Sequence, residues 1–545
     1  MSDVAVQAAL SMLLAGVAFS ASGIGRLALA GARADSLVRT VAAEYLVGLL
    51  LFSTLLGVAA HLQLPAQLVT ALFGSVALIG LWPALEPNAS RIVQGPRAPN
   101  ALRARGGIGV ILGVAFFASH VTPVNPGALD PTIYAYMTTV LFHDGWVASN
   151  LTGFPDFSGL QGTAQEGVLS RAPSLSLLWP AAALGVSLGA RSTAAAAAWF
   201  LVPTVAALVD VLPSRVSLLA RVILAIGGIG VFNEVAVLVD GQVNQTFAVA
   251  VMVGTVWGYY WLEAGHARCL LLALAGANIA AGYPEFLPAV PMYLVCCALL
   301  RPWTMRTTIL NAAALAGGLL LVQLSTQLEN VAYLVRQVDA EPAWWPLPNT
   351  PTTVVDVWQN ILLERPPPAL LAILLLPAGW WAWRSTEATT SRASPQLVRV
   401  ILAALLALAG VWSWLALQSP NQNYATFKLG GWLGPGLFLC AFLLAGHATR
   451  VLGRGLTTLI LVLATTRVLG LAIDAPPKIL LYLQSSPAPQ DRQVRAHSPG
   501  SSDRCLVRPE SDDNRAVMRT VAETAAPVRG CQLASASTLE NRLLP

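Results

Sequence analysis

The chain has 545 residues, of which 55% are hydrophobic and 11% charged, and its mean hydropathy is +0.63. Soluble domains carry about 25% charged residues, so this composition excludes an ordinary soluble globular protein and predicts an integral membrane protein. The net charge of +5 comes from arginines dispersed between apolar runs. Because these arginines form no patch, we expect no nucleic-acid partner.

Apolar runs dominate the chain from its first residues. A membrane-spanning helix needs about 20 mostly apolar residues, and about 13–15 such segments are recognisable. The predicted fold class is therefore all-α: a polytopic transmembrane helix bundle with extracytoplasmic loops and a short C-terminal tail. The first three predicted helices are the runs at 4–22, 41–60 and 64–82. The chain divides into N-terminal transmembrane helices at 1–106, a transmembrane core at 107–476 and an extracytoplasmic tail at 477–545.

Arginine positions predict the orientation. Arginines cluster between 26 and 39 and again between 91 and 105, and the positive-inside rule places these connections in the cytoplasm. The polar segment at 121–171 is then an extracytoplasmic loop. Counting the connections between apolar runs backward from the C-terminus also places arginine-bearing connections in the cytoplasm and acid-bearing ones outside. The sequence therefore predicts a multi-pass protein of the plasma membrane.

The count of membrane crossings from the N-terminus and the count from the C-terminus disagree between residues 172 and 232. Arg215 and Arg221 should be cytoplasmic, yet the apolar runs at 172–190 and 192–212 would together return the chain to the outside. One run is therefore not a full span. The second is the more suspect because it is rich in alanine, is interrupted by Pro203 and ends at Asp210. A re-entrant or tilted helix buried among others is physically allowed, and the sequence leaves the choice open.

The tail beyond Pro476 differs in composition from the rest of the chain. It is rich in Ser, Pro, Asp and Arg, with too few large apolar residues for a core, which predicts a flexible or small appended segment. Cys505 and Cys531 are the cysteines outside the apolar runs. On the outer side of the membrane they can form a disulfide, and two separate thiols are the alternative.

The outer loop at 121–171 holds carboxylates in a chain where charge is scarce: Asp130, Asp144, Asp156 and Glu166. Asp130 precedes Pro131, and residues 132–142 read as a short helix. Asp130 is well placed as the N-cap of that helix with proline at its first position. The alternative role for Asp130 is that of a catalytic or ligand-binding carboxylate.

Two cations lie where outer connections meet the membrane. Arg171 ends the loop, and Lys428, one of two lysines in the chain, follows Tyr424 in an aromatic stretch. A cation at such depth is costly unless an anion pairs with it, and a lipid-linked phosphate suits both side chains. Snorkelling to the interface is the alternative for each. Glu234 and Glu285 lie in neighbouring outer turns and are candidates to line the same cavity.

These residues carry a family resemblance. A large first outer loop bearing Asp130 and Tyr134, smaller outer turns with acids such as Glu285, and a late Tyr424-x-x-x-Lys428 resemble the GT-C superfamily of membrane glycosyltransferases, in particular actinobacterial arabinosyl- and mannosyltransferases. The resemblance covers about residues 107–476 by layout. Three apolar runs precede the loop where family members usually have one, and a large C-terminal carbohydrate-binding domain is replaced by the tail.

The resemblance implies an enzyme that transfers a sugar, with inversion, from a polyprenyl-phosphate donor to a glycan or lipid acceptor of the cell envelope at the extracytoplasmic face. Asp130 would be the general base. Many relatives have an acidic doublet where this chain has Asp130-Pro131, so Asp144 and Asp156 are alternative bases. Lys428 and Arg171 would bind the donor phosphate. The residues expected to contact the substrates are Tyr134, Glu234, Glu285 and Tyr424.

No metal ligand is predicted. Spaced carboxylates are able to hold Mg²⁺ or Mn²⁺ with a phosphate, but nothing in the sequence fixes a ligand set. The alternative function is that of a transporter or of a lipid or glycolipid flippase. Acids in outer loops rather than in the spans favour chemistry at one face over alternating access.

Overall fold

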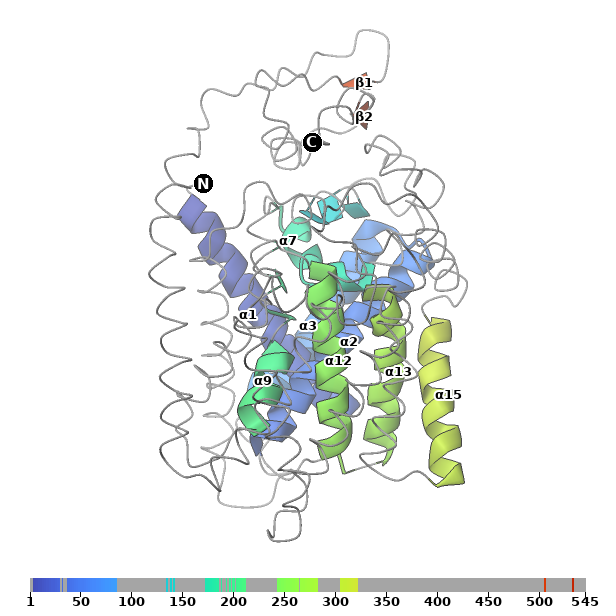
Figure 1. Cartoon of the computed structure of the whole chain (residues 1–545). Helices are drawn as coiled ribbons and strands as arrows, with labels where there is room; N and C mark the ends of the chain where they lie inside the picture. The colour runs from blue at the N-terminus through green and yellow to red at the C-terminus, as the bar shows by residue number, and fades with distance from the viewer. Residues whose placement is uncertain are drawn as a thin grey trace, which may run out of the picture.

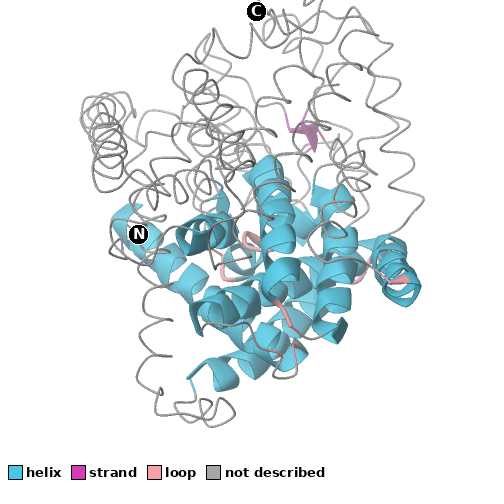
Figure 2. Ribbon diagram, turned by 60° about the horizontal axis from the view of Figure 1, so that its bottom comes forward, coloured by secondary structure: helices cyan, strands magenta, loops and turns pink. Residues whose placement is uncertain are grey.

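The computed structural model describes residues 3–29, 32, 37–85, 172–185, 188, 202–211, 243–263, 265–282 and 304–321, single positions between 134 and 200, and two short strands near the C-terminus. Nearly all of this part is helical (Figures 1 and 2). Its elements are α1 (Asp3–Ala28), α2 (Leu37–His61), α3 (Ala66–Leu85), the 3-10 helix η4 (Ala172–Leu175), α7 (Trp179–Ala183), α9 (Val202–Val211), α12 (Val243–Trp261), α13 (Gly265–Gly282), α15 (Met305–Leu321), β1 (Arg504–Cys505) and β2 (Gln532–Leu533).

The three N-terminal helices run up and down beside one another. The helices predicted from the first three apolar runs are confirmed, and each is longer than its run. Two stretches, Arg39–His61 in α2 and Ala66–Pro83 in α3, are long and apolar enough to cross a membrane. The turn between them is a Schellman motif, in which Gln63 adopts φ 51° and the Leu64 N–H donates to the Ala59 carbonyl at 3.0 Å.

Glycines bring the N-terminal helices into backbone contact. A Cβ added at Gly48 would lie 1.7 Å from the Ala21 carbonyl oxygen on α1, and one at Gly23 would lie 1.6 Å from the Gly80 carbonyl oxygen on α3. No side chain fits at either position. Close approach through small residues is how helices pack when no hydrophobic effect drives them together, as in a bilayer.

The second half of the described fold adds a hairpin and an outer helix. α12 and α13 pack against each other and against α2, whereas α15 packs on α13 at the edge of the body (Figure 1). The α13–α15 contact also depends on glycine, since a Cβ at Gly318 would lie 1.8 Å from the Ala273 carbonyl oxygen. The buried residues of α15 are Asn311, Leu315 and Gly318.

The apolar run at 172–190 is broken. It forms η4, a turn and the five-residue α7, and ends at Gly185, whose φ of +67° suits glycine. Pro173 and Pro180 lie in this stretch and cannot donate the hydrogen bonds of a longer helix. The run at 192–212, which is the more suspect in the sequence, is helical at every described position from 193 to 211. The interruption therefore falls in the first run.

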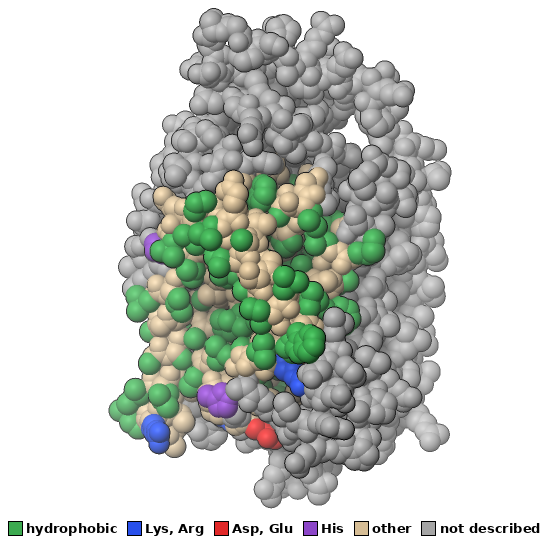
Figure 3. Space-filling view, turned by 180° about the vertical axis from the view of Figure 1, so that it is seen from behind, with side chains coloured by type: hydrophobic (Ala, Val, Ile, Leu, Met, Phe, Trp, Pro, Cys, Tyr) green, Lys and Arg blue, Asp and Glu red, His purple; other side chains and the backbone are tan. Residues whose placement is uncertain are grey.

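Large apolar side chains are exposed on the outer helices. Only 22% of the apolar window of α3 is buried, and Leu78 and Trp82 are 70% and 75% exposed. On the face in Figure 3, hydrophobic side chains spread over the middle of the described surface, while the Lys/Arg and Asp/Glu side chains lie at its lower end. A soluble monomer rarely exposes a continuous apolar face of this kind.

The tail contributes the two short strands. β1 pairs with β2 in parallel, with Cys505 opposite Leu533. This two-residue bridge is the exception to the all-α prediction within the described residues. The predicted Cys505–Cys531 disulfide is not tested, because Cys531 lies outside them.

Candidate functional site

Of the predicted site residues, the structure describes Tyr134. It lies in a helical segment at the expected place, with helical backbone at 134, 135, 138, 139, 141 and 142. The other predicted site residues lie outside the described part of the chain: Asp130, Asp144, Asp156, Arg171, Glu234, Glu285, Tyr424 and Lys428.

The helical segment at 134–142 is embedded in the protein. Tyr134 and Ala135 are 6% and 0% exposed, and Thr138 and Thr139 one turn later are equally buried. The two threonine hydroxyls donate to the carbonyls of Tyr134 and Ala135 at 2.8 and 2.9 Å, so they need no partner outside the helix. Tyr134 therefore packs into the body in this structure.

Residues near the two ends of the stretch at 143–171 contact each other on the helical body. Phe142, at the end of the helical segment, contacts Trp179 edge to face, with ring centroids 5.4 Å apart. Trp179 begins α7 and is 1% exposed, and Ala172, one residue beyond Arg171, is fully buried. Such aromatic pairs contribute about 0.5–1.5 kcal/mol beyond burial. The described residues on either side of 143–171, a range that holds Asp144 and Asp156, therefore lie close together.

A group of three hydrogen-bonded pairs, here called the outer polar layer, lies close to these anchors. It consists of Ser53 and Thr54 on α2, Ser174 and Ser176 in and after η4, Asn244 on α12 and Asn278 on α13. All six are 9% exposed or less. Buried polar groups need such mutual pairing, since each unpaired group costs about 1–3 kcal/mol.

Each bond of the outer polar layer joins two elements. Ser174 Oγ donates to Asn244 Oδ1, and the Ser53 and Ser176 hydroxyls are 2.9 Å apart. Asn278 Nδ2 donates to Thr54 Oγ1 at 2.9 Å and to the Leu50 carbonyl at 3.2 Å. The layer therefore fastens η4 and the following turn to α12 and α2, and it also joins α2 to α13.

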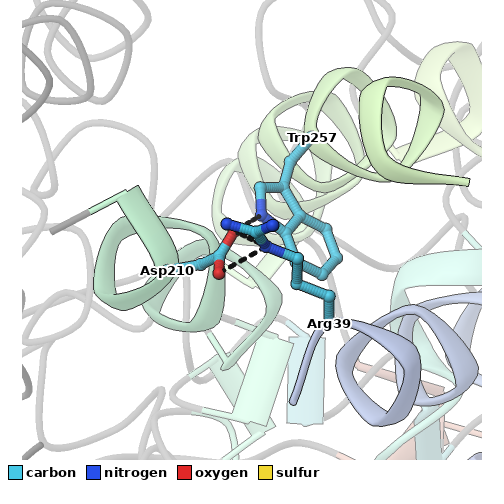
Figure 4. Close-up of polar contacts among 3 residues, drawn as sticks. All are labelled: Arg39, Asp210 and Trp257. Atoms are coloured by element: carbon cyan, nitrogen blue, oxygen red, sulfur yellow. Dashed lines mark hydrogen bonds and ion pairs between the residues drawn. The ribbon is translucent and has the colours of Figure 1, made fainter. Parts of the chain in front are cut away.

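A second polar centre lies at the opposite end of the same helices (Figure 4). Arg39 Nε donates to both carboxylate oxygens of Asp210, at 2.7 and 2.8 Å, and Trp257 Nε1 donates to Asp210 Oδ2 at 3.0 Å. The Arg39 guanidinium also lies 3.2 Å from the ring centroid of Trp261. The Arg39–Asp210 pair, with side chains 18% and 10% exposed, joins α2, α9 and α12.

Sequence reasoning missed this ion pair. From the sequence, Asp210 is interpreted only as the end of an apolar run, and Arg39 only as a sign that its connection is cytoplasmic. The two residues are 171 positions apart, so no local spacing could pair them. The sequence did contain one signal for the pair: Asp210 ends one apolar run and Arg39 precedes another. Charges beside apolar runs are costly unless an opposite charge pairs with them.

No metal centre is formed among the described residues, where no three His, Cys, Asp or Glu side chains come together. The carboxylates for which Mg²⁺ or Mn²⁺ is considered lie outside that part of the chain. The comparisons with known proteins are negative: no family model matches the chain, and no curated protein or solved structure is significantly similar.

Proposed function

We propose that the protein is a membrane glycosyltransferase that moves a sugar from a polyprenyl-phosphate donor to a cell-envelope glycan or lipid. The reaction takes place at the extracytoplasmic face of the plasma membrane, in a multi-pass protein. The proposal unites the carboxylate-bearing loop at 121–171 with the membrane character of the chain and with the GT-C resemblance of its layout.

The observation that carries the proposal is the anchoring of that loop through Phe142 and Trp179. Catalysis by a carboxylate requires a fixed position relative to the reacting atoms. A polar stretch flanked by Phe142, whose ring packs on the buried Trp179 of the helical body, meets this requirement better than a solvated connection does. Asp130 precedes the buried Tyr134 by four residues in the sequence, and Asp144 follows Phe142 by two.

The distribution of charge supports the orientation. The side chains of four arginines are described, and all lie at one end of the body: Arg26, Arg39, Arg268 and Arg306, in the last turn of α1 and the first turns of α2, α13 and α15. The positive-inside rule assigns this end to the cytoplasm. The outer polar layer and the loop anchors lie toward the other end, which would be extracytoplasmic.

In the proposed reaction, an acceptor hydroxyl oxygen attacks the anomeric carbon of the donor sugar from the side opposite the phosphate. The bond from that carbon to the phosphate oxygen breaks, and its electron pair leaves with the polyprenyl phosphate. Asp130 accepts the hydroxyl proton, since a carboxyl with an ordinary pKa near 4 is ionised at neutral pH. Lys428 and Arg171 stabilise the charge on the leaving phosphate. Glu234, Glu285 and Tyr424 contact the substrates, and Mg²⁺ or Mn²⁺ is an optional partner of the phosphate.

The test is transfer of radiolabelled sugar from synthetic polyprenyl-phosphate donors by the full-length protein in nanodiscs. Asp130→Asn removes the base and should lower the rate by at least about a hundredfold. Asp503→Asn in the tail is the matched control and should retain full activity. Loss of activity in Asp144→Asn or Asp156→Asn, with Asp130→Asn active, would move the base to that residue.

An inactive wild-type protein that remains monodisperse with every donor would contradict the proposal. Transport of a glycolipid across vesicles by that same preparation would then identify it as a flippase.

A further inference from the structure

The side chains of α2 provide a scale for depth in the bundle. α2 rises about 1.5 Å per residue from Arg39 at the arginine-bearing end to His61 at the other. Ser53 therefore lies about 21 Å above Arg39 and about 12 Å short of His61. Contacts made with α2 by the chain between 172 and 211 can be ordered on this scale.

Three contacts place the chain at successively lower levels. Ser176 meets α2 at Ser53, with 2.9 Å between the hydroxyls. The Trp199 carbonyl accepts the Tyr45 hydroxyl at 3.2 Å. Asp210 then reaches Arg39. The chain thus descends along α2 in one direction only.

α12 provides an independent scale and gives the same order. Ser174 bonds to Asn244, Phe200 stacks on Phe247 with centroids 4.8 Å apart, and Asp210 accepts the Trp257 indole N–H. The contacts at 244 and 257 are separated by about 20 Å of helix, which agrees with the distance measured along α2. From residue 200 to 210 the chain runs parallel to α12.

These levels exclude two crossings between 172 and 212. If 172–190 went inward and 192–212 returned outward, Asp210 would lie level with Ser53 rather than with Arg39. The broken backbone of η4 and α7 fits the same conclusion, because a single span would be a continuous helix.

We propose that residues 172–188 form a re-entrant segment, which enters from the extracytoplasmic side and stops at the level of Ser53, and that 193–211 makes the one crossing. Non-helical backbone at this depth is tolerated where protein buries it or where it lines a cavity, and Ser174, Ser176 and Leu188 are each 2% exposed or less. This topology places Arg215 and Arg221 in the cytoplasm, which removes the conflict in the charge count.

The re-entrant segment is then the floor beneath the loop at 121–171. Hydrogen bonds of the outer polar layer fix this floor to α2 and α12, and Trp179 in the floor contacts the ring of Phe142. That the floor belongs to a sugar-transfer site rests on the proposed function, whereas the topology does not.

The side of the membrane is tested by cysteine labelling of the full-length chain in a background free of the native cysteines. Ser214→Cys should react with a membrane-impermeant maleimide only after the cells are permeabilised, and Gln67→Cys, at an exposed position in the first turn of α3, should react in intact cells. Labelling of Cys at 214 in intact cells, with the same Gln67 result, would overturn the single crossing.

The depth is tested by cross-linking. Oxidation should join the cysteines of a Ser53→Cys/Ser176→Cys variant, whereas the control pair Thr40→Cys/Ser176→Cys, about 20 Å apart along α2, should remain reduced. No cross-link in the first pair would overturn the re-entrant depth. Neither experiment measures sugar transfer, so the topology is tested independently of activity. A protein without transferase activity would count against the proposed function alone.

Discussion

At the scale of single residues, the Arg39–Asp210 pair is the strongest polar contact among the described side chains that joins distant parts of the chain. Its carboxylate also accepts the Trp257 N–H, and its guanidinium lies on Trp261. A largely buried pair has lost much of its hydration, so removing one partner leaves a poorly solvated charge. The pair therefore contributes more to a defined arrangement of α2, α9 and α12 than to net stability.

Removing either partner is predicted to destabilise the protein. Arg39→Gln and Asp210→Asn should each cost about 2 kcal/mol, less than the roughly 3–5 kcal/mol of a fully buried pair. The double variant should cost less than the sum of the two, because the residues interact directly. Thermal unfolding in detergent measures the effect, with the exposed Arg306→Gln as a neutral control. Additive losses in the double variant would show that the two charges do not stabilise each other.

Residue roles were the least predictable part of this chain from its sequence. The arginine end is visible in the sequence because charge sets topology. The partner of Arg39 is not, since pairing across 171 positions depends on the folded path. Tyr134 falls in the expected helix, yet its burial depends on which face of that helix meets the body.

At the scale of elements, the N-terminal helices follow from apolar length alone, and all three are confirmed. The outcome for 172–190 shows the limit of this criterion. Its composition is as apolar as a span, but two prolines and two serines with partners on other helices favour a broken path. The energetic balance between one long helix and several tertiary hydrogen bonds cannot be read from hydropathy.

The contact between α13 and α15 provides a matched test of packing through glycine. Gly318→Ala should destabilise the protein by about 1–3 kcal/mol, because its methyl group would lie 1.8 Å from the Ala273 carbonyl oxygen and would push the helices apart. Gly317→Ala, at the neighbouring position with nothing within 4 Å, should be neutral or stabilising by up to about 1 kcal/mol. The melting temperatures of the two variants measure the difference. Equal shifts would mean that helix propensity, rather than close backbone approach, governs this position.

At the scale of the whole molecule, charge and apolar surface are separated along the helix direction. The described arginine side chains lie at one end and the outer polar layer lies toward the other. Exposed apolar side chains lie on α3 and α15 between them, and Figure 3 shows hydrophobic side chains over the middle of the described surface. α2 alone would be ambiguous, since 83% of its apolar window is buried, as in the core of a soluble protein. α3 is the more informative helix because its apolar side chains face outward.

This arrangement predicts that the exposed face of α3 lies in lipid. A nitroxide spin label on Leu78→Cys, where the native side chain is 70% exposed, should collide often with oxygen, which concentrates in the bilayer core, and rarely with a water-soluble nickel chelate. A label on Thr307→Cys, in the exposed first turn of α15 beside Arg306, should show the opposite preference, because the positive-inside rule predicts that this arginine-bearing end lies at the cytoplasmic interface. The full-length protein in nanodiscs gives both accessibilities from power-saturation spectra. Frequent collision of the chelate with the label at position 78 would place this face in water, and the apolar surface of α3 would then require another protein to cover it.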